Sequence, residues 1–172
     1  MALVKCPECG KQVSDKACVC PHCGIALVKR GASADEMLYD FVQEALDMPD
    51  EKREHMARLS CTIVAGYLDK VYGTKKGADI LIKLISTCLG ADGRLDNSEY
   101  EFIISVLGID LTYDALFSLV KQNFSKIDYV DAIIDSAPEK IKYSFVLLSL
   151  YIFACNGIVT GDEKALLVKY MV

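Results

Sequence analysis

Four cysteines near the start of the chain have the spacing of metal ligands. Cys6 and Cys9 form one Cys-x-x-Cys-Gly knuckle, and Cys20 and Cys23 form a second one after an interval of ten residues. In such a knuckle the backbone curls so that both sulfur atoms face one point, and two knuckles supply four thiolates in a tetrahedron, which suits Zn²⁺. In a reducing cytosol this spacing indicates a metal site rather than disulfides. The sequence therefore predicts a zinc site on Cys6, Cys9, Cys20 and Cys23.

The segment around these cysteines resembles the short bacterial zinc ribbons, which read Cys-Pro-x-Cys-Gly twice around a turn like "SDKA", here residues 14–17. The resemblance covers residues 4–26. Four thiolates leave no open coordination position for water, so a structural zinc is expected rather than a catalytic one. A segment of about 30 residues buries too little apolar surface to fold alone. The metal is therefore expected to stabilise a module that spans residues 1–30.

Two neighbouring side chains also belong to types that bind metal. Cys18 lies only two positions before Cys20, too close to form a knuckle with it. We interpret Cys18 as a spare thiol, with an alternative ligand or a redox reporter as the other interpretation. His22 follows Pro21 and is expected to point to solvent. His55 lies in a charged segment and is expected to be solvated as well.

A second pattern occurs twice in the rest of the chain. Residues 91–99 read "ADGRLDNSE" and residues 155–163 read "CNGIVTGDE", so that a glycine, an apolar residue and a glutamate recur at the same intervals. We interpret each copy as a helix–corner–helix unit, with the apolar residue plugging the corner into the core and the glutamate turned inward. Each corner is expected to end in a capping box. The expected pairs of N-cap and glutamate are Asp96 with Glu99 and Thr160 with Glu163.

The first corner also carries the oxygen ligands that Mg²⁺ and Ca²⁺ prefer, on Asp92, Asp96 and Glu99. An EF-hand is excluded, because its first two ligand positions would be Cys88 and Gly90, whereas calcium needs about six to eight oxygens. Helix capping is a sufficient reason for these residue types. We therefore favour capping, with a weak Mg²⁺ or Ca²⁺ site on Asp92, Asp96 and Glu99 as the alternative.

The elements that carry these features are expected to be helices. Apolar residues recur at helical spacing after a capping box at Ser33 and Glu36, and no stretch alternates with period two long enough to form a strand. The expected fold class is all-α: a bundle of about seven to eight helices over residues 31–172, with the two corners as repeats. Helices are expected at about 34–46, 50–72, 77–90, 97–107, 113–123, 126–136, 139–155 and 161–171. The expected apolar stripe of the second helix is Met56, Leu59, Ile63, Val64, Tyr67, Leu68 and Val71.

Charge argues against nucleic acid as a partner. The 172 residues include 24 acidic and 19 basic ones, of which residues 1–30 hold only two acidic but five basic ones. The remainder carries 22 acidic and 14 basic residues, a net charge of −8, which repels a phosphate backbone. Nucleic-acid binding is therefore not expected.

The most apolar stretch is expected to lie inside the bundle rather than in a membrane. Residues 143–161 are uncharged, but Asn156 and Gly157 interrupt them and leave about 13 helical residues, fewer than the roughly 20 that a bilayer needs. No apolar signal-peptide segment precedes Cys6, so we expect a cytoplasmic protein.

With an Ala-Asp-Gly-x-apolar-x-x-x-Glu corner and a second corner of the same pattern that begins Cys-Asn-Gly, the helical region resembles the TerB-like domain of tellurite-resistance proteins. The resemblance covers about residues 34–172 and is closer in the first corner, because Asn156 stands in place of the acid in the second. It implies a cytoplasmic helical module that binds metal through acidic residues and also binds protein partners.

These observations favour a binding protein over an enzyme. The sequence has no glycine-rich phosphate loop and no nucleophile–base pair, and Cys61, Cys88 and Cys155 are expected to be small buried hydrophobes. We expect a non-catalytic, zinc-stabilised module that binds a protein partner in a bacterial metal or stress response. The alternative is a redox or metal switch, in which oxidation of the ribbon thiols releases zinc and changes partner binding. The sequence leaves the oligomeric state open.

Overall fold

The computed structural model describes residues 2–27, 34–91, 94–124 and 127–171. Eight α-helices lie in this described part of the chain, after one small sheet, so the expected all-α class is confirmed. The strands are β1 (Leu3–Lys5) and β2 (Gln12–Ser14). The helices are α1 (Ala34–Leu46), α2 (Asp50–Tyr72), α3 (Thr74–Leu89), α4 (Asn97–Leu107), α5 (Tyr113–Phe124), α6 (Ile127–Ser136), α7 (Glu139–Phe153), the 3-10 helix η1 (Ala154–Asn156) and α8 (Gly161–Met171).

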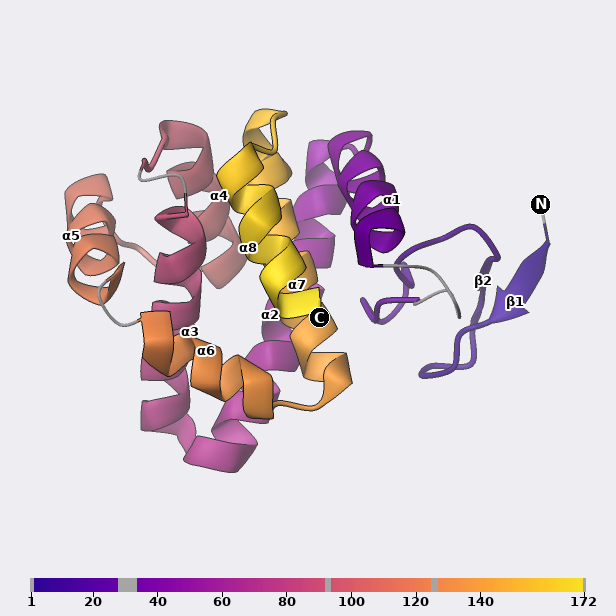
Figure 1. Ribbon diagram of the computed structural model, residues 1–172, viewed down its shortest axis with the longest axis horizontal. Coiled ribbons are helices and arrows are strands. Elements are labelled where there is room, and N and C mark those ends of the chain that lie inside the picture. The colour runs from indigo at the N-terminus through magenta and orange to yellow at the C-terminus, as the bar shows by residue number, and fades with distance from the viewer. Residues whose placement is uncertain (1, 28–33, 92–93, 125–126, 172) are drawn as a thin grey trace.

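Helix α7 forms the centre of the bundle, as expected for the most apolar stretch. Every residue from Tyr143 to Phe153 is buried, and α7 packs against α1, α2, α3 and α8. Figure 1 shows the other helices gathered around it. Among the residues that the structure describes, no helix is both long enough and apolar enough to cross a bilayer.

The buried face of α2 matches the expected apolar stripe only in part, with Met56, Val64 and Leu68 buried as predicted. Val71 is exposed and Leu59 is only half-buried, whereas the small residues Ala57 and Ser60 are fully buried. Small side chains lie there because α2 packs closely against two helices, α3 and α7. At Gly77 of α3, an added Cβ would lie 2.9 Å from the backbone of α2, which shows how near the two helices approach.

Three expected helix ends also need comment. Helix α3 begins at Thr74 rather than near residue 77, because Gly73, with φ 80°, ends α2 and leads directly into the next helix. The seventh helix ends at Phe153 and continues as the tighter η1. The predicted capping box at Ser33 lies outside the described residues.

Residues 2–27, called the ribbon below, form a small unit at one end of the molecule, beside α1, whereas α5 lies at the opposite end (Figure 1). Strand β1 pairs antiparallel with β2, with Val4 opposite Val13. The ribbon has its own small core of Cys6, Val13, Cys20 and Ile25. Residues 34–171, called the helical body below, enclose a much larger core.

Candidate metal centre

The four predicted ligands come together in the ribbon. The Sγ atoms of Cys6 and Cys23 lie 3.8 Å apart, and those of Cys9 and Cys20 lie 3.7 Å apart. All four sulfur atoms lie within 4.8 Å of one another. Zinc–sulfur bonds of about 2.3 Å in a regular tetrahedron place the sulfurs about 3.8 Å apart. The cluster therefore has the dimensions of a four-thiolate metal site and is compatible with zinc.

The two knuckles have the same local structure. In each, the first cysteine accepts a hydrogen bond at its carbonyl from the glycine that follows the second cysteine, with N–O distances of 3.0 Å for Gly10 and 2.9 Å for Gly24. Both glycines have positive φ, 70° and 72°, a conformation that other residues rarely adopt. This turn lets both sulfurs of a knuckle face the same point. The first knuckle connects β1 to β2, and its sulfurs lie close to those of the second knuckle.

The surroundings give the thiols different acidities. Burial alone would raise the pKa of Cys6, but hydrogen bonds from the backbone N–H groups of Cys9 and Glu8 and from nearby thiols lower it to about 7. Burial raises the pKa of Cys20, and burial with neighbouring thiols raises the pKa of Cys23 to about 12. Four thiols this close would repel one another as thiolates, so a metal ion that binds them must displace protons.

Metal affinity is therefore expected to fall steeply as the pH falls. Zinc binds thiolates, and the thiols of Cys20 and Cys23, whose pKa values are raised, are protonated at neutral pH. Each proton displaced weakens the apparent affinity about tenfold per pH unit. These two protons alone predict a loss of about 10⁴-fold between about pH 8 and about pH 6, and protonation of Cys6, whose pKa is about 7, adds to the loss. Competition with a chromophoric zinc chelator measures this, and an affinity that stays constant would contradict thiolate ligation.

The two other candidate ligands in the ribbon lie outside the cluster. His22 is exposed, as expected. Cys18 is buried, but its side chain belongs to the core of the helical body and not to the four-sulfur group. Its backbone N–H donates to a carboxylate oxygen of Glu44 on α1 at 3.0 Å. Cys18 is thus not one of the clustered thiols, in agreement with its interpretation as a spare thiol, and it packs at the junction of ribbon and helical body.

The three remaining cysteines lie in the helical body. Cys61 and Cys88 are buried, as expected for small hydrophobes, and burial raises the pKa of both, that of Cys88 to about 12. Cys155 is only half-buried, because α7 ends before it and the chain continues as η1. Burial still raises the pKa of Cys155 to about 12, with the charges of Glu99 and Asp96 adding to the effect.

The first corner has the expected capping box. The Asp96 carboxylate accepts a hydrogen bond from the Glu99 N–H at 2.8 Å, and the Glu99 carboxylate accepts one from the Asp96 N–H at 3.0 Å. Glu99 is 4% exposed, so its carboxylate is turned inward. Asp92 lies outside the described residues. Within the described ranges, the four cysteines are the only group of metal-ligating side chains at binding distance, and the Mg²⁺ or Ca²⁺ site stays a prediction.

The second corner repeats the first and contacts it. Thr160 and Glu163 form the expected reciprocal capping hydrogen bonds, and Glu163 is 3% exposed. Asn156, which stands in place of an acid, donates from Nδ2 to the Asp96 carboxylate at 2.9 Å, while its Oδ1 accepts from the Ile158 N–H. An amide at this position therefore joins the two corners without placing two carboxylates side by side.

Replacing this amide by an acid is expected to separate the corners. In Asn156→Asp, a second carboxylate would face Asp96 within hydrogen-bond distance, and the donor would be lost. Because this contact is exposed, the expected destabilisation is modest, about 0.5–1 kcal/mol at neutral pH. Urea unfolding measures it, with Asn97→Asp as a control on the exposed first turn of α4. A loss that persists at acidic pH, where the carboxylates are protonated, would contradict this explanation.

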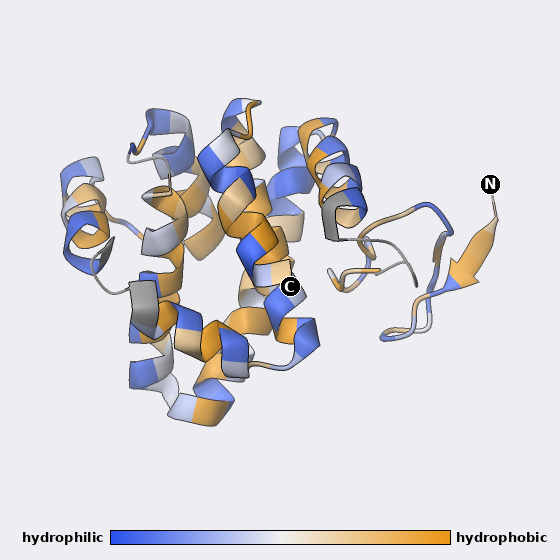
Figure 2. Ribbon diagram, in the orientation of Figure 1, coloured by the Kyte–Doolittle hydropathy of each residue, from blue (hydrophilic) through white to orange (hydrophobic). Residues whose placement is uncertain are grey.

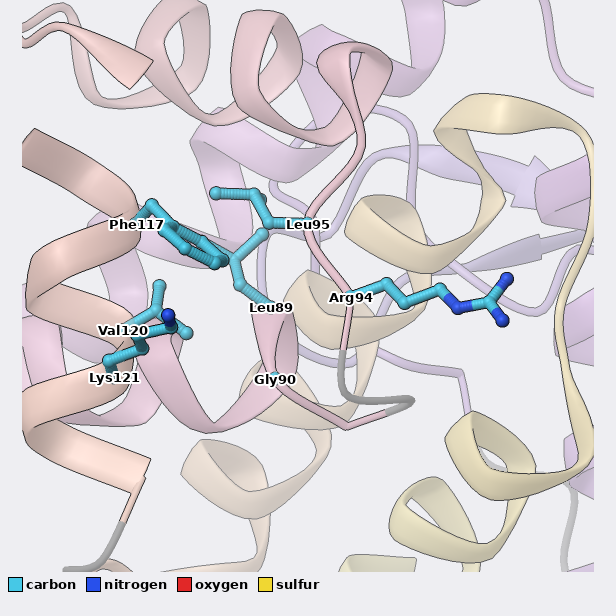
Figure 3. Close-up of a pocket in the computed structure, with 7 residues that line it drawn as sticks. All are labelled: Leu89, Gly90, Arg94, Leu95, Phe117, Val120 and Lys121. Carbon is cyan, nitrogen blue, oxygen red and sulfur yellow. The ribbon is translucent and has the colours of Figure 1, made fainter. Parts of the chain in front are cut away.

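A small apolar pocket of about 290 Å³ lies beside the first corner, between the end of α3 and α5. Figure 3 shows the side chains of Leu89, Leu95 and Phe117 converging there, whereas Arg94 extends away from them. Lys121 lies over the Phe117 ring, with Nζ 4.3 Å from its centre. The other side chains that line the pocket are apolar, and its two charged residues, Arg94 and Lys121, are both cations, so the pocket offers mainly hydrophobic contact.

The sequence analysis missed the residues of the helical body that hold the ribbon. Glu44 binds the Cys18 N–H, and Leu59 of α2 touches Gly24. Leu59 was predicted as part of an apolar stripe, and no spacing rule indicates that it would contact a metal-binding knuckle.

Comparison with known proteins gave no match, since no family model, no curated protein and no solved structure is significantly similar to this chain.

Proposed function

We propose that the protein is a non-catalytic interaction module whose ribbon is stabilised by zinc. The observation that carries the proposal is the closed group of four sulfur atoms at tetrahedral spacing. Four thiolates satisfy zinc fully and leave no position for water or substrate, so the metal would have a structural role. Four cysteines that bind a metal must stay reduced, which fits a reducing compartment, and we propose the cytoplasm.

The ribbon offers a surface that suits a protein partner. Leu3 and Val4 of β1 are adjacent, apolar and exposed by 63% and 45%. Figure 2 shows β1 as an apolar strand at the edge of the molecule. In the described part of the chain β1 pairs only with β2, so its outer edge has unpaired backbone groups. An extended segment of another protein could add a strand there.

The helical body supports a role like that of TerB-like proteins. Two corners with inward-facing glutamates, Glu99 and Glu163, are consistent with the resemblance to that family. We therefore propose a bacterial metal or stress response, such as tellurite resistance, as the setting. We do not propose nucleic acid as a partner, because the acidic helical body repels a phosphate backbone.

The test compares partners of the intact zinc-loaded chain with those of a variant that carries Leu3→Lys and Val4→Lys. A variant with Gln12→Lys, on the neighbouring strand, is the matched control for added charge. The proposal predicts one zinc per chain in all three proteins and a partner that the double variant alone fails to retain. An equal partner set for all three would refute β1 as the interaction surface, and catalysis by the purified chain would refute the non-catalytic role.

A second candidate function is a redox or metal switch. Its supporting observation is that Cys9, one of the four clustered thiols, is exposed, so an oxidant can reach the cluster from solvent. Mild peroxide would then release zinc, and a reductant would reverse the release. This candidate requires partner binding to change together with zinc release. Partner binding that is the same before and after release would eliminate it.

A further inference from the structure

The second knuckle of the ribbon faces two cores at once. Cys20 and Ile25 belong to the ribbon's own core, next to the four sulfur atoms, whereas Cys18 and Val19 belong to the core of the helical body. A backbone bridge between Val19 and Ala26 ties the two sides of this knuckle together. The segment that supplies two metal ligands is therefore also the segment that docks the ribbon on the helices.

The contact at Gly24 is unusually close. A Cβ atom added at Gly24 would lie 2.8 Å from the Cβ of Leu59, shorter than real carbon contacts allow. The φ of Gly24 is also positive, as the knuckle requires. Glycine is therefore needed here for two reasons, the knuckle turn and the approach of α2. The side chain of Leu59, half-buried, forms the surface on which the knuckle rests.

A polar contact fixes the other side of the knuckle. The Glu44 carboxylate on α1 accepts a hydrogen bond from the Cys18 N–H at 3.0 Å, and this contact is partly buried. Tyr151 of α7 lies near both residues. Burial is the main cause that raises its pKa, and the charges of Glu44 and Cys18 add to the effect. The Tyr151 hydroxyl has no hydrogen-bond partner among the described residues and is buried. The first knuckle contributes an exposed ion pair between Glu8 and Lys140, which adds little by comparison.

We infer that Leu59 and Glu44 are positioning residues for the metal site, and that zinc binding and the docking of the ribbon on the helical body are thermodynamically linked. This inference rests on the proposed zinc site. Zinc holds Cys20 and Cys23 in the knuckle conformation, and that conformation is the one that fits Leu59 and Glu44. By reciprocity, the helical body stabilises the zinc-bound ribbon by the same factor as zinc stabilises the docked state.

The linkage has a structural consequence. Without zinc, the knuckle loses the interaction that fixes its turn, and the ribbon no longer covers Leu59 on α2 or the carboxylate of Glu44 on α1. The zinc-free protein then exposes an apolar surface between α1 and α2 that the zinc-bound protein hides. The state of the metal site is thereby transmitted to the helical body.

Zinc affinity of full-length variants tests the inference. Leu59→Ala and Glu44→Ala are each expected to keep one zinc per chain but to bind it about tenfold more weakly, within the usual range of coupling between sites. Glu44→Gln, which keeps an acceptor oxygen, should restore most of the affinity. The matched controls are Leu81→Ala, which changes a half-buried leucine on α3, and Glu101→Ala, which changes an exposed glutamate on α4. Both should bind zinc as the unaltered chain does, even if Leu81→Ala destabilises the bundle.

The reciprocal measurement is the effect of zinc on unfolding of the helices by urea, followed by circular dichroism. Zinc should raise the unfolding midpoint of the unaltered chain, and the increase should be smaller in Leu59→Ala. If the unaltered chain binds zinc but Leu59→Ala and Glu44→Ala bind it equally tightly, the inference is wrong while the zinc proposal stands. If the unaltered chain binds no zinc, the proposed zinc site is wrong and the inference fails with it. Should Leu59→Ala fail to fold, Glu44→Ala and Glu44→Gln decide the question.

Discussion

Replacing Cys20 with serine is expected to abolish the metal centre and unfold the ribbon. Cys20 is fully buried, and its sulfur lies 3.7 Å from that of Cys9, in the interior of the cluster. A hydroxyl at this position does not ionise at neutral pH, and the ribbon's small core cannot replace the roughly 10–16 kcal/mol that zinc contributes in small zinc modules. We expect zinc affinity to fall by at least about 10³-fold, which is about 4 kcal/mol.

Two measurements check this result. Competition with a chelator gives the affinity, and amide hydrogen exchange over residues 2–27 reports whether the ribbon is folded, while the helical body should keep its circular dichroism signal. Cys18→Ser is the matched control, because Cys18 is a buried cysteine of the same segment that lies outside the cluster. It should keep one zinc per chain. A Cys20→Ser protein that binds one zinc as tightly as before would disprove the four-cysteine assignment.

The second large effect is expected at Arg53, a charged residue that is only 5% exposed. Its guanidinium donates to the carbonyl oxygens of Ala45 at 3.1 Å and Met48 at 2.8 Å, and it forms an ion pair with Asp50. These bonds satisfy carbonyl groups at the end of α1 and join that helix to α2. Arg53→Met removes the donors and leaves buried carbonyls unpaired, which should destabilise the protein by about 2–4 kcal/mol.

Urea unfolding followed by circular dichroism measures the change at Arg53. Lys52→Met is the control, because Lys52 is a neighbouring cation on the same helix but is exposed. Its effect should stay within about 0.5 kcal/mol. Equal effects of the two substitutions would mean that the hydrogen bonds of Arg53 do not stabilise the junction of α1 and α2.

Helix boundaries could be predicted where a local signal marks them. Pro49 precedes α2, and capping boxes that start at Asp96 and Thr160 precede α4 and α8, so these three helices begin where the sequence analysis placed them. The start of α3 carries no such signal. Its first residues, Thr74 to Lys76, are polar and show no apolar periodicity, so only the structure shows that α3 begins directly after Gly73.

The buried face of α2 was harder to predict, because packing between helices overrides side-chain hydrophobicity there. Arg53, Ala57, Ser60 and Val64 recur at helical spacing on that face, but only the last is strongly apolar. The sequence analysis made no prediction for Arg53, although the same spacing places it on this buried face. Val71, which is apolar, lies beyond the packed part of the helix and is exposed.

Some features of the candidate site could likewise be predicted from a local signal, and others could not. Its ligands were predictable because the knuckle is a local motif, in which the spacing of Cys6 and Cys9 alone determines where two sulfurs point. The contacts of Glu44 and Leu59 with the ribbon were not predictable, because they join segments far apart in the chain. The contact between Asn156 and Asp96 belongs to the same class: alignment of the two corners predicted that they are alike, but not that they touch.

Zinc K-edge X-ray absorption on the purified, reduced protein tests the central claim most directly, because it identifies the metal, its ligand atoms and their distances in one measurement. The account predicts one zinc ion per chain with four sulfur ligands at about 2.3 Å and no nitrogen or oxygen ligand. A site that contains iron instead, or zinc bound by fewer than four sulfurs with an oxygen or nitrogen ligand, would contradict it.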